Sequence, residues 1–177
     1  MTREPGGAPG AEEIRQLLLA GDPERWDAES EALLMVAARR RHLVATIWPA
    51  LDAGRIVLCD RFLDSTETYQ GAGRGLAQQS LVALHRFIAG DFLPDLTLIL
   101  DLPAAAGAAR VAARAEATTR FERMDIAFHE RLRQGFLAIA RREPQRCAVI
   151  DASRDIDAVR QAVAAAVAAR LGLTIAP

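Results

Sequence analysis

The chain has 177 residues, 51% of them hydrophobic and 25% charged, and its formal net charge is −1. This composition excludes a disordered chain and is sufficient for one domain, residues 1–177, with a substantial core. The near-zero charge gives no overall field toward nucleic acid, and no apolar run is long enough to cross a membrane. We therefore expect a cytoplasmic protein that binds neither nucleic acid nor a membrane.

Helical and strand-like patterns alternate along the chain. Apolar residues at helical spacing, with capping residues and glycine stops, predict helices at residues 11–19, from Asp27 or Ser30 to a kink or end at Pro49, and at 78–89, 104–115, 123–142 and 155–171. Runs rich in β-branched and aliphatic residues predict strands at 55–60, 96–101 and 148–151.

The strand-like runs share two features that predict the fold class. Each is apolar on both faces, and each ends in an aspartate. Such strands, separated by helices, indicate an α/β fold with a parallel β-sheet flanked by helices. Because ligands bind at the carboxyl ends of strands in these sheets, the terminal aspartates are candidate site residues.

The chain has only two cysteines, and its basic residues are all of one type. Cys59 and Cys147 lie in apolar runs without CxxC spacing, so we expect reduced, buried structural residues. All 22 basic residues are arginine, and the chain contains no lysine. A compositional bias of the gene is the simplest explanation, but sites that require lysine cannot be built from these residues.

The segment DRFLDSTETYQGAGRGL, residues 60–76, is the most informative part of the chain. Asp60 ends a predicted strand and can hold a metal-bound water, while Arg61 can bind an anion. A purely structural ion pair is the alternative for these two residues alone. The polar and aromatic residues that follow can hydrogen-bond and stack on a ligand; they are Ser65, Thr66, Tyr69 and Gln70.

Three further clusters have both functional and structural explanations. Arg3 precedes a Pro-Gly-Gly turn that allows close approach of backbone to a ligand. Met35 and Arg39 share a helix face at i, i+4 and can stack on and bond a base, although Met is more often a core residue. The third of these clusters is a series of arginines that form either a solvated helix face or phosphate-directed groups on a lid of about residues 110–123; they are Arg110, Arg114, Arg120 and Arg123.

Taken together, the motifs resemble those of bacterial thymidylate kinase over essentially the whole chain. They run in the order REPGG, LLxxAAR, DRxxxSTxxYQGxGRG, FxPDLTxxLD and RFExxxxxFHxR. The resemblance implies a three-layer P-loop kinase-like fold, a homodimer, and Mg²⁺-dependent transfer of a phosphoryl group from ATP to dTMP, giving dTDP for dTTP synthesis.

The resemblance also implies roles for the candidate residues. Arg61 is expected to bind the dTMP phosphate, with Arg3 near the transferring phosphoryl group, and Asp60 to hold magnesium through water. The nucleoside contacts implied are Met35 and Arg39 at the base, Ser65 and Thr66 facing thymine, Tyr69 against the sugar and Gln70 nearby. Lid arginines, Arg120 among them, are expected to stabilise charge on the phosphoryl group.

The sequence departs from the family at two of these positions. The family usually has Phe where Met35 stands, so base affinity is expected to be lower. The lid usually reads DRFE, and Thr119 in place of the aspartate puts an acidic lid contact in doubt.

A phosphate-binding P-loop is missing from these residues. No GxxxxGK[ST] motif occurs, and the absence of lysine leaves no degenerate version of it. We expect that the chain lacks roughly one N-terminal βαβ unit of ~30 or more residues, including the first strand, and that these residues alone have little activity. The alternatives are a non-catalytic dTMP-binding or dimerising remnant, or another deoxynucleoside monophosphate kinase.

Overall fold

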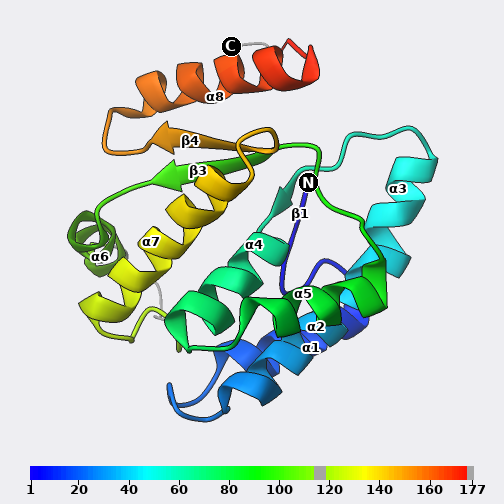
Figure 1. The fold of residues 1–177 in the computed structure, drawn as a ribbon, viewed down its shortest axis with the longest axis vertical. Coiled ribbons are helices and arrows are strands. Elements are labelled where there is room, and N and C mark those ends of the chain that lie inside the picture. Colours follow the sequence, from blue (N-terminus) through cyan, green and yellow to red (C-terminus); the bar gives the residue numbers. More distant parts are fainter. Residues whose placement is uncertain (114–118, 175–177) are drawn as a thin grey trace. The chain divides into compact units, whose positions relative to one another are not determined.

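The computed structural model describes residues 1–113 and 119–174, which form two compact units (Figure 1). The first unit contains residues 1–92 and 119–124, and the second contains residues 93–113 and 125–174. The expectation of one domain across residues 1–177 stays a prediction. The candidate residues lie mostly in the first unit.

The first unit is built on a short parallel sheet. β1 (Thr2–Arg3) pairs with β2 (Cys59–Asp60), and Arg3 is in register with Asp60. Its helical elements are α1 (Pro9–Leu19), α2 (Ala28–His42), η1 (Leu43–Ile47), α3 (Trp48–Asp52), α4 (Leu63–Thr66), η2 (Glu67–Gly73) and α5 (Gln78–Ala89). Here η marks a π-helical turn.

The long helix predicted from Asp27 begins at a capping residue and widens before Pro49. The carboxylate of Asp27 accepts a hydrogen bond of 2.6 Å from the Ser30 amide and so caps α2. Just before Pro49 the helix widens into η1, where the Trp48 amide donates to the carbonyl of Leu43. Proline lacks the amide proton and crowds the preceding turn, so a widened turn at this place accommodates it. The helical run does not end at Pro49 but continues as α3 to Asp52, and the expected kink or end is replaced by this widened turn.

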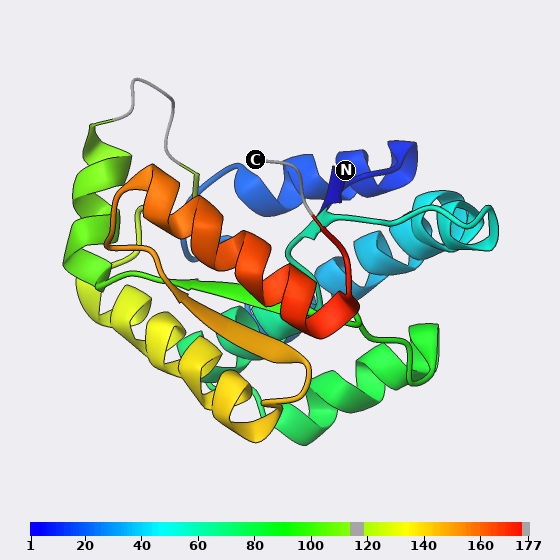
Figure 2. The ribbon, with the colours of Figure 1, turned by 90° about the horizontal axis from the view of Figure 1, so that it is seen from above.

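The second unit contains a second parallel sheet with helices packed on it. β3 (Thr97–Asp101) pairs with β4 (Cys147–Asp151), and Asp101 is in register with Asp151. The helices are α6 (Ala104–Ala112), α7 (Ile126–Arg142) and α8 (Ile156–Leu171). Within this unit α7 packs on both strands and α8 packs on β4, from opposite sides of the sheet (Figures 1 and 2).

Most predicted elements are confirmed, and the differences have local causes. The predicted α/β class with parallel strands is observed. The predicted strand 55–60 is wrong in length, because only Cys59 and Asp60 have partners on β1 and form a strand. Helix α7 begins at Ile126 rather than 123 because Asp125 caps it through the Phe128 amide. The helical turns α4 and η2 were not predicted, since the glycines of GAGRG indicated a loop.

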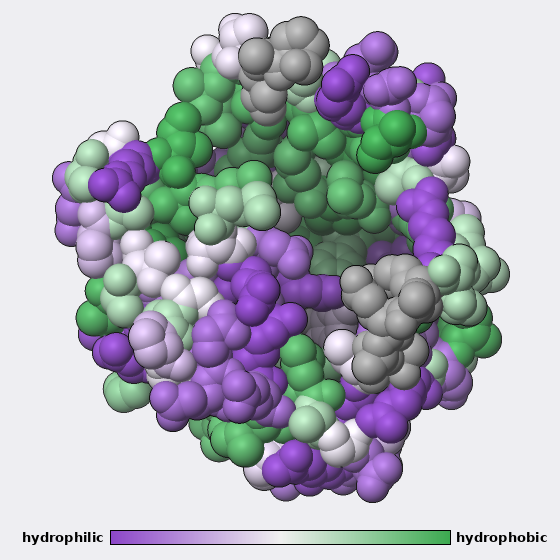
Figure 3. Space-filling model, turned by 180° about the vertical axis from the view of Figure 1, so that it is seen from behind, coloured by the Kyte–Doolittle hydropathy of each residue, from purple (hydrophilic) through white to green (hydrophobic). Residues whose placement is uncertain are grey.

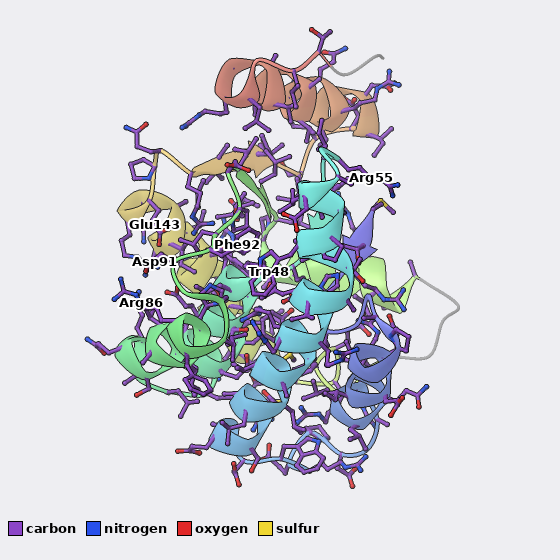
Figure 4. The ribbon with its side chains drawn as sticks, turned by 90° about the vertical axis from the view of Figure 1, so that its right-hand side faces the viewer. Trp48, Arg55, Arg86, Asp91, Phe92 and Glu143 are labelled. Atoms are coloured by element: carbon purple, nitrogen blue, oxygen red, sulfur yellow. The ribbon has the colours of Figure 1, made fainter. Side chains whose placement is uncertain are left out.

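Aromatic and aliphatic residues make the core of each unit. In the first unit Leu43, Ile47, Phe62 and Leu63 are buried together. Trp48 and Phe92 pack against this cluster. Their two rings meet each other edge to face, with centroids 6.2 Å apart (Figure 4). In the second unit Ile99, Ile139, Ala140 and Cys147 are buried together between β3, β4 and α7.

Both sheets leave apolar residues exposed. Beside or on the strands, Ile56 is 75% exposed, Leu58 61%, Leu100 57% and Val149 45%. Apolar side chains accordingly form part of the molecular surface (Figure 3). Parallel strands are normally covered on both faces, so these residues are unusual for such sheets.

Among the described residues, Cys59 and Cys147 form no disulfide. Cys147 is buried, as predicted, whereas Cys59 is only partly buried. Burial raises the pKa of the Cys59 thiol to about 12, with further contributions from Glu4 and Asp60, so this thiol stays protonated at neutral pH. In the described part of the chain, no helix has the length and apolar character needed to cross a membrane.

Candidate functional site

The DR dipeptide lies at the carboxyl end of β2, beside the REPGG turn. Pairing of Arg3 with Asp60 continues in a 2.8 Å hydrogen bond from the Glu4 amide to the Asp60 carbonyl. Arg3, Asp60 and Arg61 are all exposed at this end of the sheet. The structure therefore brings the REPGG and DR motifs together at one end of this sheet.

Arg61 has an unusual backbone conformation. Its φ is +70°, a region that non-glycine residues enter at an energetic cost and that is common at functional sites. The guanidinium carbon lies 5.0 Å from the centre of the Tyr69 ring, in cation–π contact. Tyr69 in turn contacts Phe121 edge to face. Arg61 and Tyr69, both predicted site residues, are thus neighbours.

Arg39 is held in the interior by a network that starts in the REPGG turn. Its Nε donates to Glu4 Oε2 at 2.7 Å, and its Nη2 donates to Thr66 Oγ1 at 2.9 Å. Glu4 Oε1 also lies 3.1 Å from Nδ1 of His42, whose Nε2 lies 2.7 Å from Thr2 Oγ1. Glu4, Arg39, His42 and Thr66 are all buried.

One nitrogen of Arg39 is left without a hydrogen bond in the described ranges. Nη1 is buried and has no hydrogen-bond partner among residues 1–113 and 119–174. The guanidinium also lies over the Phe62 ring, 4.9 Å from its centre. Met35, one helical turn earlier on α2, is half-buried. The predicted pair of Met35 and Arg39 therefore combines an apolar side chain with an unsatisfied donor.

The glycines of REPGG serve packing within the protein. Gly7 has φ +80°, and a Cβ there would overlap the His42 imidazole. The Gly7 amide donates to Glu12 Oε1 at 2.9 Å. This hydrogen bond is the main cause that lowers the pKa of Glu12, with help from Arg3. The turn accommodates Glu12 and His42, and the predicted close approach of its backbone to a ligand stays a prediction.

Arg3 has a neighbouring cation that was not predicted. Arg3 Nη2 donates to Glu12 at 3.2 Å in an exposed pair. Arg15, on α1, donates to the Pro5 carbonyl at 2.8 Å. Its pKa is lowered mainly by burial and also by repulsion from Arg3 and Arg61, so the three guanidinium groups share one electrostatic environment. Such a group of arginines is suited to a phosphate.

Gln70 belongs to a second buried network, centred on Glu31. Gln70 Nε2 donates to Glu31 Oε1 at 2.7 Å, and Arg120 Nη2 pairs with Glu31 Oε2. Arg74 Nε lies 3.3 Å from Glu31 Oε1. Gln70 Oε1 is buried and, in the described ranges, has no hydrogen-bond partner. The structure thus leaves an unsatisfied acceptor on Gln70 as well as an unsatisfied donor on Arg39.

The predicted lid arginines lie in different surroundings. Arg120 is 1% exposed, and its Nε and Nη1 donate to the carbonyls of Leu18 and Pro23. Arg123 is exposed and donates to the Gly21 carbonyl, while Arg110, in the second unit, donates to the Ala152 carbonyl. Arg114 lies outside the described residues. The predicted action of these arginines on a phosphoryl group stays a prediction.

Asp60 stands without a cluster of other metal ligands. Over the described ranges, no group of three or more His, Cys, Asp or Glu side chains is arranged to hold a metal. Mg²⁺ typically keeps several waters and uses one or two carboxylates with substrate phosphates. The exposed Asp60 carboxylate at the end of β2 fits that role. Ser65, another predicted site residue, is half-buried on α4 and follows Asp60 closely in sequence.

Comparison with known proteins decides the family. The family model for thymidylate kinase matches residues 1–163. The chain belongs to the thymidylate kinase family. It is 55% identical over 173 residues to the thymidylate kinase of Caulobacter vibrioides, covering 98% of this chain and 83% of that protein. It is 51% identical to that of Pseudomonas putida strain W619, covering 92% and 78%.

A solved thymidylate kinase also has this fold. The crystal structure of thymidylate kinase from Ehrlichia chaffeensis superposes with a TM-score of 0.74 at 36% identity, covering 94% of this chain and 78% of that one. The predicted family is therefore confirmed, and with it the class of nucleoside monophosphate kinase. The alternative of a non-kinase remnant is not favoured by these relatives.

Sequence reasoning missed three residues of this candidate site. Glu4 and Glu31 are acidic residues in a turn and in a first helical turn, where such residues are commonly exposed. Arg15 lies on an amphipathic helix, where arginine is commonly solvated. The only available signal was the position of Glu4 inside the REPGG motif.

Proposed function

We propose that the protein binds dTMP and carries out its phosphorylation by ATP, giving dTDP. The proposal rests on membership of the family together with one observation in this chain. That observation is the buried Arg39, two of whose nitrogens are fixed by Glu4 and Thr66 while Nη1 has no partner in the described ranges. A buried charged donor without a partner is costly, and a base carbonyl would satisfy it.

Gln70 supports recognition of thymine in particular. Its buried Oε1 is an unsatisfied acceptor within the described residues. Thymine carries a proton on N3 and a carbonyl on C4, so it complements an acceptor on Gln70 and a donor on Arg39. Cytosine has an unprotonated N3 and an amino group on C4, and would meet both groups with the wrong polarity. Met35 supplies an apolar surface for the ring, and Ser65 and Thr66 are the nearby hydroxyl groups.

Arg61 is the proposed ligand of the dTMP phosphate, with Arg3 and Arg15 beside it. The two N–H groups of a guanidinium match two oxygens of a phosphate. Arg15 is held by the Pro5 carbonyl and Arg3 by the Glu12 carboxylate. Tyr69, packed between Arg61 and Phe121, offers a face for the sugar. These contacts would orient the phosphate toward the transferring phosphoryl group.

Magnesium and ATP are the proposed cosubstrate pair, with Asp60 holding the ion through water. Bound Mg²⁺ neutralises charge on the transferring phosphoryl group. The residues present do not supply the usual cradle for a triphosphate, because they contain neither GxxxxGK[ST] nor lysine. We propose no contact between these residues and the triphosphate.

Binding and turnover can be tested separately. Isothermal titration calorimetry of the 177-residue chain is expected to show dTMP binding in preference to dCMP and dGMP. A coupled assay with ATP and Mg²⁺ is expected to show little or no dTDP. Failure to bind dTMP would contradict the site, whereas turnover typical of a kinase would contradict the need for a further phosphate loop.

A homodimer and a cytoplasmic location are proposed from the family. Several large apolar residues of the first unit are exposed, and we propose that such residues pack against the partner subunit; they are Leu33, Val44, Leu51 and Phe87. Light scattering after size exclusion would show a mass of two chains. A monomer at micromolar concentration would contradict this proposal.

A further inference from the structure

Glu31 is a fully buried carboxylate that joins three segments far apart in the sequence. Gln70 and Arg74 come from the YQGAGRG segment, and Arg120 follows 89 residues after Glu31. Glu31 is 0% exposed, and the Arg120 and Arg74 side chains are 1% and 11% exposed. A buried carboxylate without partners is strongly unfavourable, so this one depends on its two cations and its amide donor.

The two arginines are themselves fixed, which makes Glu31 a rigid acceptor. Arg120 donates through Nε and Nη1 to the carbonyls of Leu18 and Pro23, at 3.1 and 2.7 Å. Arg74 donates to the carbonyls of Pro23 and Trp26, at 2.8 and 3.2 Å. All of these acceptors lie at the end of α1 or in the connection to α2. The Glu31 carboxylate therefore has little freedom to turn.

The orientation of the Gln70 amide follows from this arrangement. A carboxylate only accepts hydrogen bonds, so Gln70 must turn its NH₂ group toward Glu31 Oε1. The amide oxygen then points to the other side, where it is buried and has no partner in the described part of the chain. With a neutral, two-sided group at position 31, the amide could turn over and present a donor instead.

We propose that Glu31 is a positioning residue that sets which edge of the base is accepted, by holding the Gln70 amide with its oxygen toward the ligand. Arg120 and Arg74 hold the Glu31 carboxylate in place, and Arg120 acts here through Glu31 rather than on the phosphoryl group. This inference rests on the proposed dTMP site. It predicts that Glu31, which does not touch the ligand, controls the preference for a base with a proton on N3 over one without it.

The test compares dTMP and dCMP binding by calorimetry in wild type and Glu31→Gln. The variant keeps the shape of the side chain but can donate or accept, so the ratio of dTMP to dCMP affinity is expected to fall by about 10-fold or more. Glu29→Gln, in the same first turn of α2 but exposed, is the matched control and should leave the ratio unchanged. A folded Glu31→Gln protein with the wild-type ratio would overturn the proposal.

A second measurement decides the question if Glu31→Gln does not fold. In nitrogen-15 NMR spectra of wild type, the two side-chain amide protons of Gln70, assigned by their loss in Gln70→Leu, are expected to be distinct and slow to exchange with water. Averaged or fast-exchanging signals would overturn the proposal. Wild type that fails to prefer dTMP over dCMP would instead contradict the proposed function, so the two failures are distinguishable.

Discussion

Glu4 Oε2 and Arg39 Nε lie 2.7 Å apart, joining the turn that follows β1 to the middle of α2 across 35 residues of sequence. Their side chains are 5% and 2% exposed, so the pair is shielded from water and from salt. The pairing fixes the plane of the guanidinium and thereby the direction of Nη1, which has no hydrogen-bond partner in the described part of the chain. Glu4 thus positions the group proposed to bind the base.

Glu4→Gln is expected to weaken dTMP binding by roughly 10-fold and to lower the free energy of unfolding by about 3 kcal/mol, because it leaves Arg39 buried without its counter-charge. Calorimetry and urea denaturation measure the two effects. Glu13→Gln, at an exposed position of α1, should change neither. Wild-type affinity in Glu4→Gln would show that Arg39 does not need this partner to bind the base.

Arg61→Gln is expected to weaken dTMP binding by roughly 10- to 100-fold while leaving thymidine binding nearly unchanged, because only the phosphate contact is lost. The comparison of the two ligands separates a phosphate role from a general disturbance of the site. Arg86→Gln removes an arginine from an exposed pair with Asp91 (Figure 4) and serves as the control. An equal loss for both ligands would speak against a phosphate contact at Arg61.

Met35→Phe is expected to strengthen dTMP binding by roughly 3- to 10-fold, because an aromatic ring stacks on the base more favourably than a thioether does. Met35 is half-buried, so the side chain is not enclosed on all sides by the protein. The same variant should leave the thermal midpoint of the free protein within a few degrees of wild type. Weaker binding would place the base away from this side chain.

His85 is expected to make stability fall as the pH is lowered through about 6.5. Burial lowers the pKa of His85 from its ordinary value of 6.5, and Nε2 lies 2.8 Å from the Phe92 carbonyl. The unfolded chain therefore takes up a proton that the folded chain does not, so stability is present above the ordinary pKa and lost below it.

Urea denaturation between pH 5 and 8 measures this dependence. His85→Gln should reduce the slope by up to about 1.4 kcal/mol per pH unit, since one titrating group is removed. His129→Gln, on the partly exposed start of α7, is the matched control. An unchanged slope in His85→Gln would mean that the His85 pKa is the same in both states.

Local patterns in the sequence were enough for much of the fold. Helices α5 and α8 and strands β3 and β4 follow from apolar periodicity and from caps such as Asp155, because these depend on neighbours in sequence. Strand β1, which brings Arg3 beside Asp60, was not predicted, because its two residues carry no strand pattern of their own. The family could be identified from motifs whose order is a property of the chain alone.

The partners of the buried charges were decided only by the tertiary structure. Glu4 with Arg39, and Glu31 with Arg120, are 35 and 89 residues apart, and they are drawn from 23 acidic residues and 22 arginines in the chain. A salt bridge in the interior forms where packing removes water from both groups. A local sequence pattern does not predict which two groups will be buried together. The short length of β2 has the same origin, because a strand extends only as far as its partner. The sequence alone therefore determined the family, the long helices and strands β3 and β4, and the tertiary structure decided which buried charges pair with one another.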